Sequence, residues 1–221
     1  MNPLFNQIVY AENIFLELLP LIRQFPKAIL FAITFLFFVE CSSGQSITLN
    51  YKVIQGGDEI GWIKLQKSDS GTTTLITFNS EAKKRMILKF EIKEQQSATF
   101  QNGIVMKSTV YRKVNNDIKI DKSTVNKGTY YLVSEKEKSA QVLVNGIQYN
   151  QLSMYFKEPE NIKQVYSDNF QCFLNIENLG NHSYKIKLPS GDTNYYYYAN
   201  SQCSKLKAVH SLFSVEFVLS K

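Results

Sequence analysis

The sequence has few of the residues from which metal centres and nucleophilic active sites are usually built. It contains two histidines, three cysteines and one tryptophan among 221 residues. His182 and His210 lie 28 positions apart and form neither an H-x-H nor an H-E-x-x-H pair, the spacings that bring two imidazoles to one zinc ion. The chain also has no G-x-S-x-G motif, which would present a serine nucleophile. We therefore expect no bound metal, no cofactor and no enzymatic activity.

A long hydrophobic run is also missing. The longest is Ala28–Val39, which holds twelve uncharged and mostly apolar residues, whereas a helix that spans a bilayer needs about 20. Arg23 and Lys27 precede this run, and small residues follow it. A basic segment, an apolar segment of about 7–15 residues and a small-residue exit make up a secretory signal. The pattern predicts export to the periplasm or cell envelope.

The leader has more than one predicted end. Small residues before Gln45 favour cleavage there, which makes residues 1–44 the signal peptide and residues 45–221 a single domain. Cys41 is an alternative site for a lipid anchor, but Glu40 occupies the position where a bacterial lipidation motif has a small residue. A third alternative is that the run stays attached as a signal anchor in the membrane.

Basic residues outnumber acidic ones. The net charge is +6, and loss of residues 1–44 raises it to about +7, because three carboxylates and two basic residues leave with the leader. Basic proteins often bind nucleic acid or anionic membrane surfaces. Here the lysines are scattered singly along strand-like segments, which is typical of the wet face of a sheet. We expect no nucleic-acid partner, and the sequence leaves the oligomeric state open.

The two cysteines beyond the leader, Cys172 and Cys203, admit two interpretations. An oxidising compartment would allow them to pair in a disulfide. A free cysteine is also ordinary on an apolar strand face, which is where the alternation around Cys172 places it. The sequence leaves both alternatives open.

Apolar and polar residues alternate with a period of two along most of the chain after the leader. Turn signals such as Asn102-Gly103 separate these segments, and strands recur every 8–14 residues. One buried and one wet face is typical of an antiparallel sheet. We predict a mostly β fold, with a single antiparallel, strongly curved sheet that forms a half-barrel or a partly open barrel. The clearest alternating segments are 86–92, 170–177, 183–188 and 213–220.

One segment departs from this alternation. Tyr149, Leu152 and Phe156 stand at i, i+3 and i+7, which is the spacing of one helix face. Pro159 would end such a helix, since the residue before a proline avoids the α region. We predict one short helix near 148–157, with the curved sheet wrapped around it.

The aromatic run Tyr195–Tyr198 and the single Trp62 suggest a stacking surface for a glycan or a base. Tyrosine is also a good strand former, and its ring packs well in a core with the hydroxyl at the edge. Core packing is the simpler explanation for both features.

Carboxylates offer the only route to catalysis that the sequence leaves. Two of them in one cleft would suit a hydrolase of the glycosidase type. Sequence spacing alone brings no two together, so this function ranks below a non-enzymatic role. The candidates are Glu158, Asp168, Glu177 and Asp192.

Several motifs resemble those of a known family. They are YKVIQGGDEIGWIKL at 51–65, LSMYFKEP at 152–159, QVYSDNFQCF at 164–173, HSYKIKLPSGDTNYYYYAN at 182–200 and SVEFVL at 214–219. Together they resemble an uncharacterised domain-of-unknown-function family of exported bacterial β proteins. That family is distantly similar to periplasmic half-barrels, including lipoprotein carriers, in which helices close a curved sheet. The resemblance implies an apolar ligand between sheet and helix, but it transfers no functional residue.

These features lead to one expected function and one alternative. We expect a non-enzymatic module that binds an apolar or lipid-like ligand, with Trp62, Met154, Tyr155 and Tyr197 near the pocket. The alternative is a scaffold of the cell envelope in which an exposed edge strand at Tyr195–Tyr198 pairs with a partner protein.

Overall fold

The computed structural model describes residues 44–85, 89–136, 138, 141–143 and 146–220. The predicted signal peptide and Cys41 therefore lie outside the described residues, as do Met86 and Leu88 of the alternating segment 86–92. None of the helical structure in the described residues has the length and apolar character needed to cross a bilayer.

Within the described residues the chain forms fourteen β-strands in one antiparallel sheet, ordered β8-β7-β6-β5-β4-β3-β2-β1-β14-β13-β12-β11-β10-β9. The order has two ends, so the sheet is not closed into a barrel, and the mostly β fold class is confirmed. The strands are β1 (Gln45–Gln55), β2 (Asp58–Ser70), β3 (Thr73–Arg85), β4 (Lys89–Gln101), β5 (Ile104–Val114), β6 (Asp117–Asn126), β7 (Tyr131–Glu135), β8 (Gln141–Leu143), β9 (Gln164–Ser167), β10 (Cys172–Gly180), β11 (Ser183–Lys187), β12 (Thr193–Ala199), β13 (Gln202–Val209) and β14 (Ser214–Leu219).

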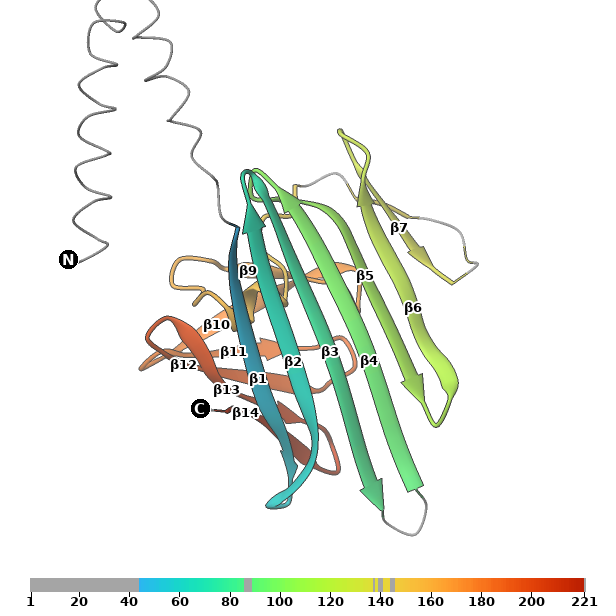
Figure 1. The fold of residues 1–221 in the computed structure, drawn as a ribbon, viewed down its shortest axis with the longest axis vertical. Coiled ribbons are helices and arrows are strands. Elements are labelled where there is room, and N and C mark those ends of the chain that lie inside the picture. Colours follow the sequence, from blue (N-terminus) through green and yellow to red (C-terminus); the bar gives the residue numbers. More distant parts are fainter. Residues whose placement is uncertain (1–43, 86–88, 137, 139–140, 144–145, 221) are drawn as a thin grey trace, which may run out of the picture. The chain divides into compact units, whose positions relative to one another are not determined.

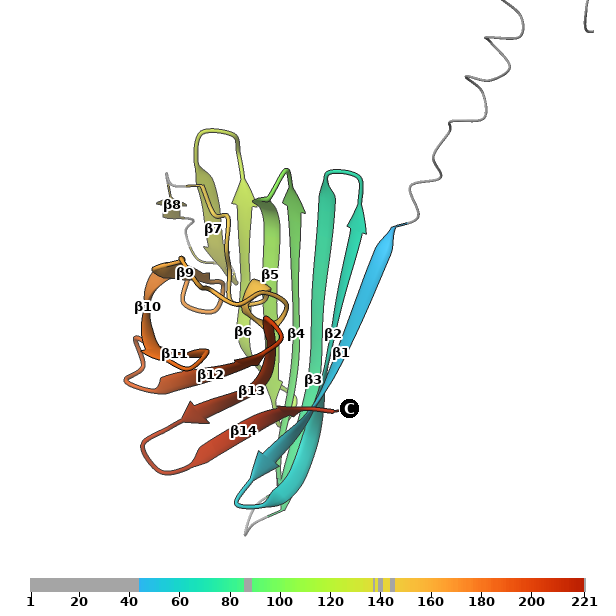
Figure 2. The same cartoon turned by 90° about the vertical axis from the view of Figure 1, so that its left-hand side faces the viewer.

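The sheet folds back on itself where the first strand meets the last. β1 pairs with β14, with Tyr51 opposite Leu219 and Ile54 opposite Glu216. The long strands β1–β6 form one layer, and β9–β14 lie across one of its faces (Figures 1 and 2). We call the face of each strand that points into this fold the inner face and the opposite one the outer face.

The core fills the space between the two halves of the sheet. Inner-face side chains from the first half, such as Leu65, meet those of the second half, such as Ile186, and both are 0% exposed. Met154, from the segment between β8 and β9, lies among them and is also 0% exposed. Burial of each such side chain contributes about 1.5–3 kcal/mol. The protein's own side chains therefore fill the interior around these three residues.

The segment between β8 and β9 contains less helix than its sequence predicts. Within the described residues the helix expected over 148–157 is a single 3-10 turn, η1 (Ser153–Tyr155). The preceding residues are extended because they pair with β9: the Tyr166 N–H donates to the Tyr149 carbonyl, and the Gln151 N–H donates to the Tyr166 carbonyl, each at 3.0 Å. Backbone pairing with the sheet thus overrides a helical spacing that reflects burial alone.

Candidate functional site

The four residues predicted to line a pocket do not come together. Met154 and Tyr155 are buried in the core, where the Tyr155 ring packs edge-on against Tyr51 with centroids 5.4 Å apart. Trp62 is 47% exposed and lies on the outer face of β2, because its neighbours along the strand face inward. Tyr197 lies on the outer face of β12 for the same reason. The structure thus divides the predicted site between the core and the outer face.

The tyrosine run is split by the strand period. Tyr196 and Tyr198 are buried, at 2% and 7% exposure, while Tyr195 and Tyr197 are half-buried on the outer face. Both interpretations of the run therefore apply, each to alternate residues. The expected edge strand is wrong, since β12 pairs with β11 on one side and with β13 on the other. Long-range pairing sets strand order, and the sequence of a single strand does not reveal it.

A buried carboxylate lies between the η1 segment and the β10–β11 turn. The Glu158 side chain is 3% exposed. The Tyr184 hydroxyl donates to Glu158 Oε1 at 2.8 Å, and His182 Nδ1 lies 3.0 Å from the same oxygen. Burial, followed by the hydrogen bond to Glu158, raises the pKa of Tyr184 to about 12, so its hydroxyl remains a neutral donor.

This carboxylate borders an open pocket of about 400 Å³. From the sequence, Glu158 was a candidate catalytic carboxylate, and nothing there connected it with His182. A contact across 24 residues has no signal in local spacing, so it could not have been predicted. The pocket is lined by Glu158, Glu160, Asn178, Gly180, Asn181, His182 and Tyr184.

The His182 ring extends from a two-residue hairpin turn with left-handed backbone. Asn181 and His182 have φ angles of 48° and 55° and are the two central residues of the turn between β10 and β11. Such a turn matches the twist of the flanking strands, but left-handed backbone costs a residue other than glycine about 1–2 kcal/mol. The Glu158 contact and a hydrogen bond from the Tyr198 N–H to the His182 carbonyl, at 2.9 Å, offset this cost.

Removal of the Tyr184 hydroxyl should test how much Glu158 depends on its donors. Tyr184→Phe leaves a buried carboxylate with one hydrogen bond fewer, and we expect a loss of about 2 kcal/mol in the free energy of unfolding, measured by urea denaturation. The exposed Tyr130 provides the control, since Tyr130→Phe should change stability by less than about 0.5 kcal/mol. Equal effects of the two substitutions would contradict this account of Glu158.

A second buried carboxylate ties the segment between β8 and β9 to the long strands. Asp168 is 4% exposed, and it accepts hydrogen bonds from the Ser108 hydroxyl of β5 and from Asn150 Nδ2, the latter at 2.9 Å. Burial raises the pKa of Asp168 to about 6, although both hydrogen bonds act in the opposite direction. Ser108 and Asn150 are themselves 1% and 0% exposed, so this cluster has a structural role.

The four candidate carboxylates occupy four separate settings. Among the described residues, no two of them share a hydrogen-bond or ion-pair partner. These contacts therefore show no pair of carboxylates of the glycosidase type. Their partners are Tyr184 and His182 for Glu158, Ser108 and Asn150 for Asp168, Lys185 for Glu177, and Ser190 and His210 for Asp192.

The cysteines and the metal-ligand residues are equally dispersed. Cys172 and Cys203 are free cysteines, so the disulfide alternative is not the one that the structure shows. They lie on β10 and β13, with two strands between them, or about 14 Å along the sheet, whereas a disulfide needs Cα atoms within about 7 Å. Among the described residues no three His, Cys, Asp or Glu side chains are grouped to hold a metal ion.

The inner face is left partly open at one end of β3, β4 and β5. Ala82, Ile92 and Val114 are cross-strand neighbours there and are only half-buried, and Phe90 beyond them is 46% exposed. On the same face of β4, Ala98 is 0% exposed. Figures 1 and 2 show this end of β3 and β4 reaching past β14. We call Ala82, Phe90, Ile92 and Val114 the open row.

A charged pair separates the open row from the packed core. Glu94 and Arg112 are cross-strand neighbours on the inner face, and Arg112 donates to Glu94 through Nε at 2.7 Å and through Nη2 at 3.0 Å. Gln96 Nε2 donates to Glu94 at 2.6 Å. The Arg112 side chain remains 29% exposed, so the pair adds a polar group that solvent or a ligand can reach beside the apolar row.

Comparison with known proteins places the chain in a family. Residues 51–220 match the sequence pattern of DUF6134, a domain of unknown function. The chain belongs to the DUF6134 family. The DUF6134 domain thus covers the sheet from β1 to β14, which confirms the expected membership of an uncharacterised family.

Other comparisons add little to this assignment. No curated protein matches the DUF6134 chain. The crystal structure of a β-barrel-like protein of the unknown-function family DUF1849 from Brucella abortus is similar at 11% sequence identity, with a TM-score of 0.49, over 79% of this chain and 95% of that chain.

Proposed function

We propose that this DUF6134 domain is a non-enzymatic, exported module that binds an apolar or lipid-like ligand on the open row. The observation that supports this most is the half-burial of Ala82, Ile92 and Val114 on a sheet face that, beyond the Glu94–Arg112 pair, forms the core. Apolar surface that a folded domain leaves partly uncovered often marks a binding site. Export rests on the leader sequence.

The location of the ligand differs from the one that the sequence predicted. Met154 and Tyr155 occupy the centre of the fold, so a ligand bound there would have to displace packed side chains. The open row requires no such displacement. A ligand that removes roughly 300 Å² of apolar surface from water gains about 7–8 kcal/mol before the cost of association. Association itself costs at least about 4 kcal/mol, so we expect a millimolar dissociation constant from the apolar contact alone.

Arg112 gives the open row a neighbour for a ligand headgroup. Two of its N–H groups bond Glu94, and a guanidinium has five. The remaining donors lie at the border between core and open row, where a carboxylate or phosphate at the end of an apolar chain would meet them. This arrangement favours an amphipathic lipid over a purely hydrocarbon ligand.

Native mass spectrometry after incubation with a bacterial lipid extract tests the proposal. The purified protein should retain a bound lipid, and Ile92→Glu should reduce the bound fraction at least tenfold by placing a charge in the open row. Leu75→Glu is the matched control, since Leu75 is 41% exposed on the outer face of β3. Only the bare protein mass, or equal losses in the two variants, would contradict the proposal.

A further inference from the structure

We propose that the outer face of β11–β13 binds an acidic polysaccharide. The face combines half-buried tyrosine rings with a regular array of lysines, and it lies on the opposite side of the sheet from the inner-face core. The inference is therefore independent of the apolar ligand. We call this surface the tyrosine–lysine face, and it consists of Tyr195, Tyr197, Lys185, Lys187, Lys205 and Lys207.

Strand register sets the array. Tyr195 of β12 stands opposite Lys185 on β11 and opposite Lys207 on β13. Neighbouring strands lie about 4.8 Å apart, so the two lysines flank the ring at a separation of about 10 Å. Two positions along β12, Tyr197 stands opposite Lys205, whose Nζ lies 4.7 Å from the centre of the ring. Each ring thus has at least one ammonium group beside it.

The charge on the face is only partly balanced. Lys185 pairs with Glu177 at 2.8 Å, and Lys205 lies 3.9 Å from Glu216. In the part of the chain that the structure describes, no carboxylate lies within ion-pair distance of Lys187 or Lys207. The face therefore carries a net positive charge and is complementary to an anionic partner.

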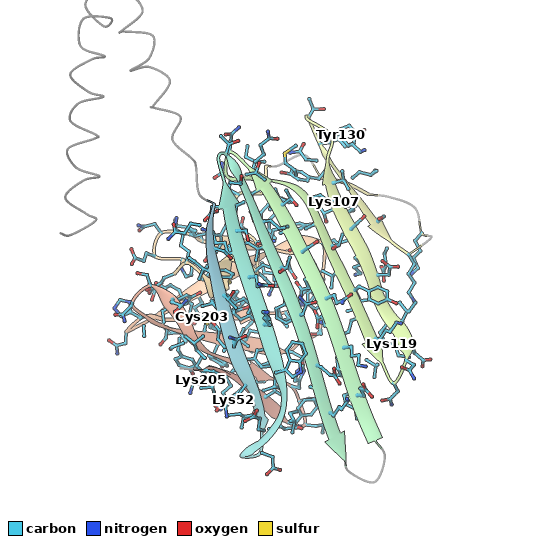
Figure 3. All side chains as sticks on the ribbon, viewed as in Figure 1. Lys52, Lys107, Lys119, Tyr130, Cys203 and Lys205 are labelled. Atoms are coloured by element: carbon cyan, nitrogen blue, oxygen red, sulfur yellow. The ribbon has the colours of Figure 1, made fainter. Side chains whose placement is uncertain are left out.

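One further lysine of this face lies beyond β14, on β1. Lys205 stands opposite Val218 on β14, and Val218 stands opposite Lys52 on β1. Figure 3 shows Lys52 and Lys205 on the same side of the molecule, while Lys119 and Tyr130 lie on the distant β6 side. On β14 itself the same face carries Val218 and Glu216, so the lysines of β11–β13 and Lys52 form two basic groups with β14 between them.

The combination of groups favours a polysaccharide among anionic partners. The negative face of a tyrosine ring attracts the C–H groups of a sugar ring, and its hydroxyl can hydrogen-bond sugar hydroxyls. The lysines can meet the carboxylates of the sugar chain. Leu212, an apolar side chain that is 92% exposed, lies in the turn between β13 and β14 and not on this face. A membrane would require such a side chain at the centre of the contact.

Affinity electrophoresis with polygalacturonate as the acidic probe and dextran as the neutral one tests the inference. The purified protein should be retarded by polygalacturonate and not by dextran, and the retardation should weaken as salt is raised. Tyr195→Ser combined with Tyr197→Ser should weaken binding about tenfold, as should Lys185→Gln combined with Lys207→Gln. Both pairs are at the surface, and unchanged thermal unfolding would verify that the variants fold.

Matched controls lie far from the face. Tyr130→Ser and Lys119→Gln change the same residue types on the β6 side and should leave polygalacturonate binding within twofold of the wild type. Equal retardation by dextran, or equal binding by the tyrosine variant and the wild type, would overturn the inference. So would displacement of polygalacturonate by anionic lipid vesicles or by DNA at lower concentration than by the free polysaccharide.

Discussion

Gly61→Ala is expected to lower the free energy of unfolding by about 3 kcal/mol or more. Gly61 lies on the inner face of β2 opposite Ala82 of β3. A Cβ atom on Gly61 would lie 2.1 Å from the Glu81 carbonyl oxygen and 2.6 Å from the Ala82 Cα, and both are backbone atoms of β3 that cannot rotate away. The strands would have to separate where the inner face reaches the open row, and urea denaturation would measure the cost.

Gly146→Ala is the control for this prediction. A Cβ atom on Gly146 would meet nothing within 4 Å, and its φ angle is not positive. This substitution should leave stability unchanged or raise it slightly, because alanine restricts the unfolded chain. If Gly61→Ala unfolded at the same urea concentration as the Gly146 variant, β2 and β3 could not approach as closely as described.

The second large effect concerns pH and the buried Asp168. Its pKa in the folded protein is about 6, against 3.8 for an unperturbed aspartate. The unfolded state therefore releases its proton first as pH rises, and the contribution of Asp168 to stability falls between about pH 4 and pH 6. The full difference is about 3 kcal/mol.

Asp168→Asn should remove this dependence. An asparagine can accept from Asn150 Nδ2 and donate to the Ser108 hydroxyl, so both hydrogen bonds have replacements without a buried charge. We expect the variant to gain stability relative to the wild type as pH rises from 4 to 7, as measured by urea denaturation at each pH.

Asp192→Asn provides the opposite case. A hydrogen bond from Ser190, together with His210, holds the pKa of Asp192 below its usual value, so the wild type should gain stability relative to this variant as pH rises through the acid range to just above the usual aspartate pKa. If the difference in free energy of unfolding between Asp168→Asn and the wild type did not change between pH 4 and 7, the pKa of Asp168 would not be raised by burial.

Local features of the fold could be predicted from the sequence because short-range sterics decide them. Alternation placed Tyr184 and Ile186 on one face of a strand, and both are buried, at 4% and 0% exposure. The Asn102-Gly103 pair predicted a tight turn, and both residues have the positive φ angles, 50° and 75°, that such a turn needs. The alternation of side chains along a strand also explains why Trp62 faces outward.

Long-range features could not be predicted in this way. The pairing of β1 with β14 joins segments at opposite ends of the domain, and no local pattern specifies it. The same limit applies to the candidate site, where Asp168 meets Ser108 across 60 residues. The helical spacing around Leu152 was misleading, because the same spacing arises when an irregular segment is buried on several sides.

The most direct test of the apolar-ligand proposal is a methyl NMR titration of the isoleucines with dodecanoate. The account predicts that the Ile92 methyl signals of the open row shift with increasing ligand while those of Ile186, which is 0% exposed in the core, stay unchanged. Shifts at Ile186 with none at Ile92, or no shift at either residue, would contradict a ligand site on the open row.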